Sequence, residues 1–196
     1  MHGLVNRAIQ CFVRDTYSPE SWERLARLSD LPASGFEAMF VYDDAVTARM
    51  LETAEHLLGK TRETLLEDIG TYLVSHENVQ ALRRLLRFGG ETFLEFLQSI
   101  DDVPRRAHLA IPDLELPSID VIGIEENTFH IGCTWKQAGF GHVLVGMLRT
   151  LADDYGALVL LDHQGEDGGV ETISIQILHD EFSAGRPFQL AAEAHS

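Results

Sequence analysis

Histidine and cysteine are the residue types of this 196-residue chain whose side chains could bind a metal or attack a substrate. The nine histidines are dispersed, whereas a metal site needs several such side chains to converge. The two cysteines, Cys11 and Cys133, lie far apart and match no zinc-binding spacing. Free cysteine is commonly buried, so the pattern favours two reduced thiols inside the protein.

The sequence carries no motif that is typical of a catalytic centre. It contains no nucleophile elbow, P-loop or paired-histidine zinc signature. The glycine-rich stretch "GFGHVLVG", residues 139–146, lacks the lysine that usually accompanies a phosphate loop. We therefore expect this stretch to serve helix entry and packing, and we expect the protein not to be an enzyme.

The charge balance excludes several classes of partner. The formal net charge is -16 at pH 7, which argues against a nucleic-acid surface, since that needs clustered lysine and arginine. The same charge disfavours an anionic membrane surface. No apolar run approaches the roughly 18 residues that span a bilayer, and the first residues do not read as a signal peptide. We expect a cytoplasmic protein with no membrane contact.

Helical periodicity dominates the first hundred residues, where apolar side chains recur every three or four positions. Ser18 before Pro19, and Gly59 and Gly89 after apolar stretches, are typical of helix starts and ends. The helices predicted from these signals cover residues 4–17, 18–29, 43–59, 61–75, 77–90 and 91–103.

The pattern changes at Pro104. Alternating apolar residues predict strands at 118–124, 128–135, 157–164 and 170–180, with an amphipathic helix over 139–156 between the two pairs. A proline disfavours helical geometry in the residue before it, so we expect the last N-terminal helix to end there. The predicted fold is α+β: a helical subdomain packed on a four-stranded antiparallel sheet with one long helix.

A single domain with three parts follows from this change. The helical subdomain covers residues 1–103, the sheet subdomain covers 104–183, and a tail without sheet pattern covers 184–196.

The order of elements and several short sequence segments resemble the H-NOX family, the heme–nitric oxide/oxygen binding domains of soluble guanylate cyclases and their bacterial relatives. The opening "MHGLVNRAIQCFVRDTY" is similar to the family's Met-x-Gly start and first helix. "FLEFLQSIDDVP", "LPSIDV" and "GMLRTLADDYG" resemble its leucine-rich helix, first strand and sheet-side helix. The resemblance covers nearly the whole chain and implies a bacterial heme-based gas sensor in signal transduction.

At the positions that hold heme in the family, this sequence differs. The resemblance places Pro104 where the family has the histidine that binds the iron, and a proline ring has no lone pair to offer. It places Cys133, Trp135 and Gln137 on the family's Tyr-x-Ser-x-Arg motif, which binds the heme carboxylates. We expect these three to share one face of a strand, with Trp135 lying across the entrance that the heme carboxylates occupy in the family. Pro117 matches the family's proline that packs on the porphyrin.

Two histidines are the candidates for a substitute iron ligand. His108 follows Pro104 by four positions, and His76 follows the helix predicted over 61–75. An axial histidine also needs an oriented pocket and a supporting partner. By the family's ligation we expect no cofactor, with heme as the alternative.

Three functions remain open. The first is a regulatory domain that binds a small apolar ligand and signals in trans to a histidine kinase or to a cyclic-nucleotide or cyclic-dinucleotide enzyme. The second is a heme-binding NO or O2 sensor with a substitute ligand. The third is a protein-interaction module whose pocket is filled by side chains such as Trp135.

Overall fold

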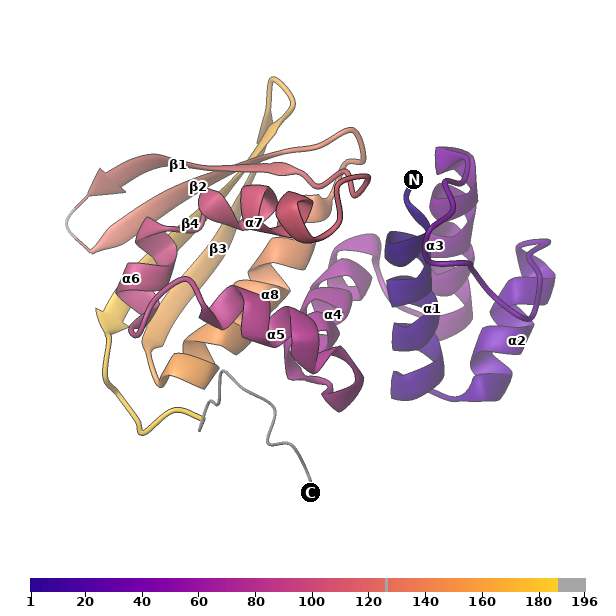
Figure 1. Ribbon diagram of the computed structural model, residues 1–196, viewed down its shortest axis with the longest axis horizontal. Coiled ribbons are helices and arrows are strands. Elements are labelled where there is room, and N and C mark those ends of the chain that lie inside the picture. Colours follow the sequence, from indigo (N-terminus) through magenta and orange to yellow (C-terminus); the bar gives the residue numbers. More distant parts are fainter. Residues whose placement is uncertain (126, 187–196) are drawn as a thin grey trace.

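The computed structural model describes residues 1–125 and 127–186, and it has the predicted α+β architecture. Helices make up the N-terminal part, and a four-stranded antiparallel sheet with one long helix makes up the C-terminal part. Figure 1 shows the first three helices at one end of the molecule and the sheet at the other, with further helices between them. The predicted tail lies largely outside the described residues, because its residues 187–196 are not among them.

Local capping explains where the first helices begin and end. The hydroxyl of Ser18 accepts a hydrogen bond from the amide of Ser21, and Pro19 opens the second helix, where its missing N–H costs nothing. Gly59 ends the third helix in the left-handed conformation, with φ of 64°. The first four helices are α1 (Gly3–Thr16), α2 (Pro19–Leu28), α3 (Asp44–Leu58) and α4 (Arg62–Ser75).

Short helices connect α4 to the sheet. Thr92 and Glu95 form a capping box at the start of one of them, in which each side chain bonds to the other residue's backbone amide. The connecting elements are the 3-10 turn η1 (Glu77–Val79), α5 (Gln80–Arg87), α6 (Phe93–Gln98) and α7 (Asp102–Ala110).

The expectation that a helix ends at Pro104 is wrong. The leucine-rich helix α6 already ends at Gln98, and Pro104 is the third residue of a new helix, α7. The amides in the first turn of a helix have no carbonyl partner within that helix, so a proline there removes no hydrogen bond. Pro104 therefore lies near the start of a helix, and the segment after it is helical.

The sheet has the strand order β1-β2-β4-β3, and every neighbouring pair is antiparallel. The alternation of apolar residues sets this register, because one face of the sheet is buried against a helix. The strands are β1 (Ser118–Glu125), β2 (Thr128–Thr134), β3 (Leu158–Asp167) and β4 (Val170–His179), and the helix is α8 (Phe140–Tyr155).

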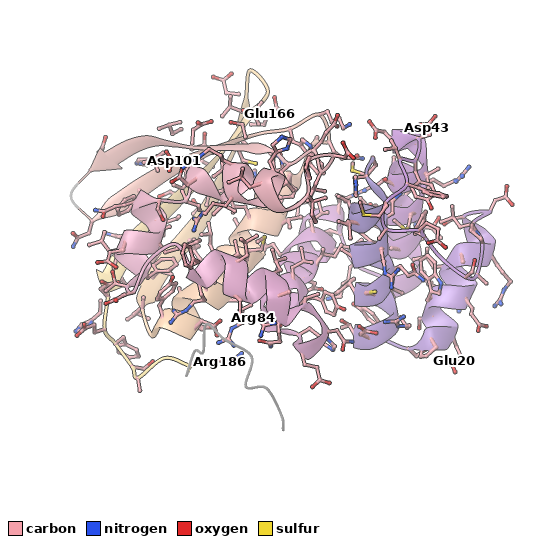
Figure 2. All side chains as sticks on the ribbon, in the orientation of Figure 1. Glu20, Asp43, Arg84, Asp101, Glu166 and Arg186 are labelled. Atoms are coloured by element: carbon pink, nitrogen blue, oxygen red, sulfur yellow. The ribbon has the colours of Figure 1, made fainter. Side chains whose placement is uncertain are left out.

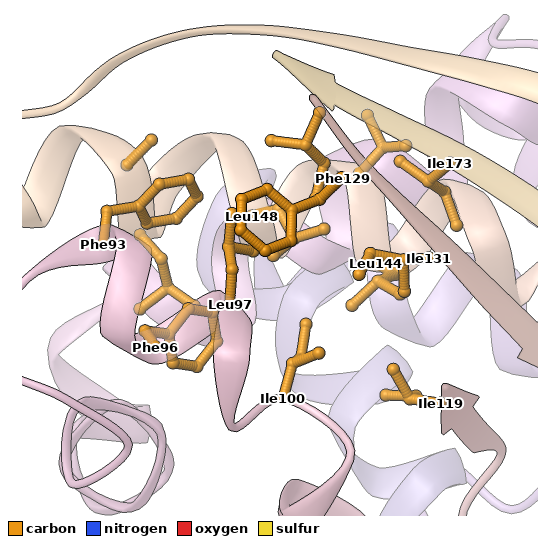
Figure 3. Packing of buried hydrophobic residues seen from close by; sticks show 14 of the residues in the cluster. Phe93, Phe96, Leu97, Ile100, Ile119, Phe129, Ile131, Leu144, Leu148 and Ile173 are labelled. Carbon is orange, nitrogen blue, oxygen red and sulfur yellow. The ribbon is translucent and has the colours of Figure 1, made fainter. Parts of the chain in front are cut away.

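The main hydrophobic core lies between α8, α6 and the inner face of the sheet. Figure 3 shows Phe93 and Leu97 of α6, Leu148 of α8, and Phe129 and Ile173 of the sheet in this layer. Burial of this apolar surface, at about 25 cal/mol per Å², is the dominant force that holds the sheet to the helices.

Two glycines let α4 and α8 pack backbone against backbone. A Cβ atom built on Gly70 of α4 would lie 2.0 Å from the carbonyl oxygen of Val143, and one on Gly146 of α8 would lie 2.0 Å from that of Glu67. No larger residue fits at either position without moving a helix. This contact fixes the distance between the two helices.

The acidic residues are spread over the surface. Figure 2 shows Glu20, Asp43 and Glu166 on separate elements, and all three are exposed. Within the described residues, no helix is long and apolar enough to cross a membrane.

Candidate functional site

A large apolar cavity lies between the N-terminal helices and the end of the sheet. Its volume is about 680 Å³, within the range of about 300–1,000 Å³ that is usual for ligand pockets. Helices α1, α4, α5, α7 and α8 contribute walls, and the segments before β1 and after β2 close one side. The aliphatic residues of these walls include Leu4, Val5, Ala8, Leu66, Ile69, Leu73, Leu82, Leu85, Leu86, Val103, Ile111, Leu114, Leu116, Val143, Leu144 and Leu148.

Four of the five residues predicted for the site line this cavity. Pro104 contributes from the first turn of α7, and Pro117 contributes from the position just before β1. Trp135 and Gln137 contribute from the segment that joins β2 to α8. The structure thus brings together residues that are up to 33 positions apart in the sequence, from Pro104 to Gln137.

Cys133 is not among the residues that line the cavity. It is buried in the core between the sheet and α8, and its backbone pairs with Ile119 of β1 and Glu171 of β4. Burial raises the pKa of its thiol to about 12, so the side chain stays neutral at physiological pH. The predicted strand was also one residue too long: β2 ends at Thr134, so Trp135 and Gln137 lie in the following segment.

Neither candidate for a substitute iron ligand lines the cavity. His108 lies on α7, where its side chain is exposed. His76 follows the end of α4, where Nδ1 accepts a hydrogen bond from the amide of Asn78 and the ring packs on Tyr72 at 4.8 Å. That hydrogen bond uses the lone pair of Nδ1.

Trp135 is half-buried at the edge of the cavity. Its ring meets Phe140, the first residue of α8, edge to face with centroids 5.0 Å apart. Aromatic pairs of this geometry contribute about 0.5–1.5 kcal/mol beyond their burial. Both rings are part of the cavity wall, so Trp135 narrows the cavity without filling it.

Among the described residues, charged side chains occur at the rim of the cavity and not in its lining. Lys136 lies between the lining residues Trp135 and Gln137, and its ammonium group donates to Glu115 at 2.5 Å and lies 3.6 Å from Asp44. The hydrogen bond from Lys136 lowers the pKa of Glu115. The N-terminal ammonium group of Met1 also lies 2.6 Å from Asp44, so two cations face two carboxylates, and these pairs link the start of α3 to the segments before β1 and after β2.

A second polar cluster lies where α1 meets the end of α4. Asp15 accepts hydrogen bonds from Arg14, Tyr72 and Asn78 at 2.8, 2.7 and 2.9 Å. Burial acts to raise the pKa of Asp15, but these hydrogen bonds outweigh it and the pKa falls to about 2. Asn78 also lines the cavity, so the cluster forms its polar edge.

The start of α8 is occupied by a carboxylate of the protein itself. Glu171 of β4 is buried and accepts hydrogen bonds from the amides of Gly139 and Gly141, at 2.9 and 3.1 Å. His163 accepts from the amide of Gly165 at Nδ1, so its Nε2 carries the proton and donates to Glu171 at 3.0 Å. The glycine-rich stretch serves helix entry, as the sequence predicts, and an internal carboxylate stands where a phosphate would bind.

The lining does not supply the groups that usually hold heme. An axial ligand to heme iron is usually histidine, cysteine, methionine or tyrosine, and arginine commonly binds carboxylates in pairs of hydrogen bonds. Among the described residues that line the cavity there is no histidine, cysteine, tyrosine, lysine or arginine, and the sulfur atoms belong to Met1 and Met147. Nor does any group of three or more histidine, cysteine, aspartate or glutamate side chains in the described chain form a metal site. The cavity has room for a large ligand, but its donors do not fit heme held by histidine and paired carboxylate contacts.

Sequence reasoning missed the walls contributed by α1 and α5. Leu4 and Ala8 of α1, and Leu82 and Leu85 of α5, face the cavity. Their helical spacing was visible, but the same spacing is typical of an ordinary core. The available signal was the strongly one-sided pattern "QALRRLLR" of α5, which places leucines opposite arginines.

Comparisons with known proteins agree with the fold and with the resemblance. Residues 2–163 match the profile of the family described as Haem-NO-binding. Among curated proteins, soluble guanylate cyclase 89Da of Drosophila melanogaster is 21% identical over 158 residues, which cover 81% of this chain and 24% of that protein. Soluble guanylate cyclase gcy-31 of Caenorhabditis elegans is 20% identical over 154 residues, which cover 79% of this chain and 22% of that protein. The chain therefore spans about a quarter of the length of these relatives.

Solved structures share the same fold. An H-NOX protein from S. oneidensis in the Fe(II) ligation state superposes with a TM-score of 0.78 at 15% identity, over 92% of this chain and 98% of that one. An oxygen-binding H-NOX domain related to soluble guanylate cyclases superposes with a TM-score of 0.70 at 14% identity, over 95% of this chain and 100% of that one.

Proposed function

This chain belongs to the Haem-NO-binding family of sensor domains, and from that membership we propose that it is a regulatory domain that senses an apolar ligand in its cavity. The domains of this family are not catalytic. In the proposal, the cavity of about 680 Å³ takes a ligand other than heme held by the family's histidine.

The observation that carries the proposal is the chemistry of the cavity wall around Pro104. The resemblance assigns this position to the iron ligand, and Pro104 lines the cavity but cannot bind a metal. Gln137, which the resemblance assigns to an arginine position, lines the same cavity and carries no charge. An apolar ligand needs neither group, because burial of its hydrocarbon surface supplies the binding free energy.

The partner in the proposal is a separate signalling protein in the cytoplasm. The curated relatives are named soluble guanylate cyclases, and they match this chain over about a quarter of their length. A histidine kinase, or an enzyme that makes or degrades a cyclic nucleotide or cyclic dinucleotide, is the proposed receiver. Its surface would have to tolerate a protein of net charge -16.

A heme-dependent gas sensor with a substitute iron ligand is the second candidate, and the family match favours it. His108 and His76 are outside the lining of the cavity, so either would have to move to reach a porphyrin. A module with a filled pocket is not supported, because the cavity stays open beside Trp135.

The experiment that separates the first two candidates is a hemin titration of the purified protein, followed in the visible spectrum and by native mass measurement. We expect no sharp Soret band and no stoichiometric heme adduct in the wild-type protein. The double variant Pro104→His with Gln137→Arg should take up hemin, because it adds an iron ligand and a cation to the cavity wall. Pro104→Ala is the matched control and should behave as wild type.

A stoichiometric wild-type complex with a histidine-ligated spectrum would refute the proposal. The variants His108→Ala and His76→Ala would then identify the ligand.

A further inference from the structure

We infer that a ligand enters the cavity at one particular edge, and that the ion pairs of Lys136 hold this edge closed. This inference rests on the proposed function, because it describes how access to the same cavity is regulated. Three observations carry it: the places where the cavity wall meets solvent, the contacts that span those places, and the exposure of the charged groups in these contacts.

The cavity meets solvent at two edges. Among the described residues that line it, three are exposed: Asn78, Ala81 and Ala138. Asn78 and Ala81 lie together where η1 passes into α5, whereas Ala138 lies in the segment between β2 and α8. The other described lining residues are buried or half-buried, so these two edges are the most direct routes from solvent to the apolar interior.

A compact hydrogen-bonded cluster spans the first edge. Asp15 of α1 accepts hydrogen bonds from Asn78 and from the buried Tyr72, and only 10% of its side chain is exposed. Hydrogen bonds to a carboxylate that is largely removed from water are stronger than those at a surface. The pKa of Asp15 is about 2, so this carboxylate keeps its charge at physiological pH and the first edge stays joined.

Exposed ion pairs span the second edge. Lys136 lies on the same segment as Ala138, and its ammonium group donates to Glu115 at 2.5 Å and lies 3.6 Å from Asp44. Asp44 also lies 2.6 Å from the N-terminal ammonium group of Met1. Glu115 belongs to the segment before β1 and Asp44 opens α3, so one lysine ties three parts of the wall together.

The pairs of Lys136 are weak enough to open. The side chains of Lys136, Glu115 and Asp44 are 43%, 72% and 50% exposed. Exposed ion pairs contribute little, because water and salt screen them and long side chains lose freedom when they pair. Glu115 and Lys136 each lie between two residues that line the cavity, so separation of the two charged groups frees a piece of the wall on either side.

The rates at which a neutral apolar dye enters and leaves the cavity test the inference. Nile red carries no charge, so the rim does not steer it, and its fluorescence rises in apolar surroundings. In stopped-flow mixing at low salt, Lys136→Met should raise the association and dissociation rate constants together by about two- to fivefold, the range that one or two exposed ion pairs allow. The dissociation constant should stay nearly unchanged, because the variant opens the edge without altering the apolar wall.

Lys60→Met is the matched control. Lys60 is the other lysine of the chain; it pairs with Asp68 at 2.5 Å, and neither residue lines the cavity. The variant loses the same charge and the same kind of ion pair, and its rate constants should equal those of the wild type. Added salt should speed exchange in the wild type and in Lys60→Met but not in Lys136→Met.

A second pair of variants locates the entrance. Ala138→Leu adds a larger side chain at the Lys136 edge and should lower the association rate constant. Ala81→Leu makes the same change at the other edge and should leave it as in the wild type. Slower association in Ala81→Leu alone, or equal rate constants in Lys136→Met and Lys60→Met, would overturn the inference.

Acrylamide quenching of tryptophan fluorescence gives a readout that needs no ligand. Trp135 is half-buried beside Lys136, and the other tryptophan, Trp22, is only 3% exposed, so a change in quenching reports on the edge. Lys136→Met should be quenched more strongly than Lys60→Met. A wild-type protein that does not bind Nile red contradicts the proposed function, and the quenching then still decides about the edge: equal quenching of the two variants contradicts the inference.

Discussion

At the scale of single residues, the side chains of the cavity wall are mostly apolar and uncharged, and the charged interactions lie at its edges. Pro104, Pro117 and Gln137 contribute surface without charge, whereas Asp15 and Lys136 hold neighbouring segments together. The wall thus suits a ligand that needs shape and burial, and the edges supply interactions that depend on pH and salt.

Asp15 should make the protein sensitive to acid. The pKa of Asp15 is about 2 in the folded protein against 3.8 for an unperturbed carboxyl, so the unfolded state binds its proton first. The stabilisation is therefore complete above about pH 4 and is lost as the pH falls towards 2. In urea unfolding at several pH values, the free-energy difference between wild type and Asp15→Asn should shrink over this window. A difference that stays constant down to pH 2 would show that the charge of Asp15 has no such role.

Trp135 should contribute less stability than a fully buried tryptophan. Fully buried aromatic residues cost about 3–5 kcal/mol when truncated to alanine, but Trp135 is half-buried and retains one packed ring partner, Phe140. We expect Trp135→Ala to lower the free energy of unfolding by about 1–3 kcal/mol in chemical denaturation. Trp135→Phe, which keeps a ring against Phe140, should lose less than half of that. A neutral result for Trp135→Ala would mean that the wall does not depend on this side chain.

The candidate site was predictable only in part, and only through family likeness. Pro104, Pro117, Trp135 and Gln137 do line one cavity, although nothing in their local spacing requires it. Cys133 was grouped with Trp135 and Gln137 by the resemblance, and strand alternation, which cannot show where a strand ends, placed the three on one face. The packing of α1 and α5 around the cavity depends on tertiary contacts between distant segments, and a single sequence does not specify them.

At the scale of helices and strands, periodicity predicted most of the architecture. Both strand pairs and α8 follow from alternation and helical spacing, since each buries one face. The helix α7 was missed because Pro104 was interpreted as a stop, although proline is tolerated in the first turn. The break between α6 and α7 falls on Ser99 and the two residues after it, and none of these is a proline or glycine that would predict a helix end.

The crossing of α4 and α8 should be intolerant of any side chain. Alanine is favoured over glycine by about 1 kcal/mol inside a helix, but at Gly146 its Cβ would lie 2.0 Å from a backbone oxygen of α4. Overpacking of this kind usually costs about 1–3 kcal/mol or more. We therefore expect Gly146→Ala to lower the free energy of unfolding by about 2 kcal/mol, measured by urea denaturation.

Gly123 of β1 is the control for this substitution. A Cβ there would meet its nearest neighbour, His130, at an ordinary 3.6 Å. Gly123→Ala should change the unfolding free energy by less than about 1 kcal/mol. Equal effects of the two substitutions would mean that the helix crossing relaxes easily.

At the scale of the whole molecule, repulsion among the charges that give the net charge of -16 destabilises the compact folded state. Glu20, Asp43 and Glu166 lie on separate elements, so repulsion acts across the entire surface and not within one patch (Figure 2). The same field keeps other acidic surfaces away, and an effective partner would present a basic face.

Salt should therefore stabilise the protein. Screening is weak at low ionic strength, where the Debye length is about 30 Å at 0.01 M, and it is strong at 0.15 M, where the length is about 8 Å. We expect the thermal midpoint to rise across this range, because the repulsion among acidic groups outweighs the loss of exposed ion pairs such as Lys136 with Glu115. A midpoint that falls with added salt would show that the ion pairs dominate.

Gly70 packs against the backbone of Val143 and Gly146 packs against the backbone of Glu67, so α4 and α8 form one rigid pair in the middle of the molecule (Figure 1). At these two contacts no side chain separates the backbones, so the helix pair resists both sliding and twisting. Helices α1, α2 and α3 pack on α4 in a second hydrophobic cluster, and Tyr72 of α4 donates a hydrogen bond to Asp15 of α1, so side chains hold them to α4. Contacts between side chains rearrange more easily than contacts between backbones, so we expect a ligand that enlarges the cavity to shift α1, α2 and α3 relative to α4 and to leave the crossing of α4 and α8 unchanged.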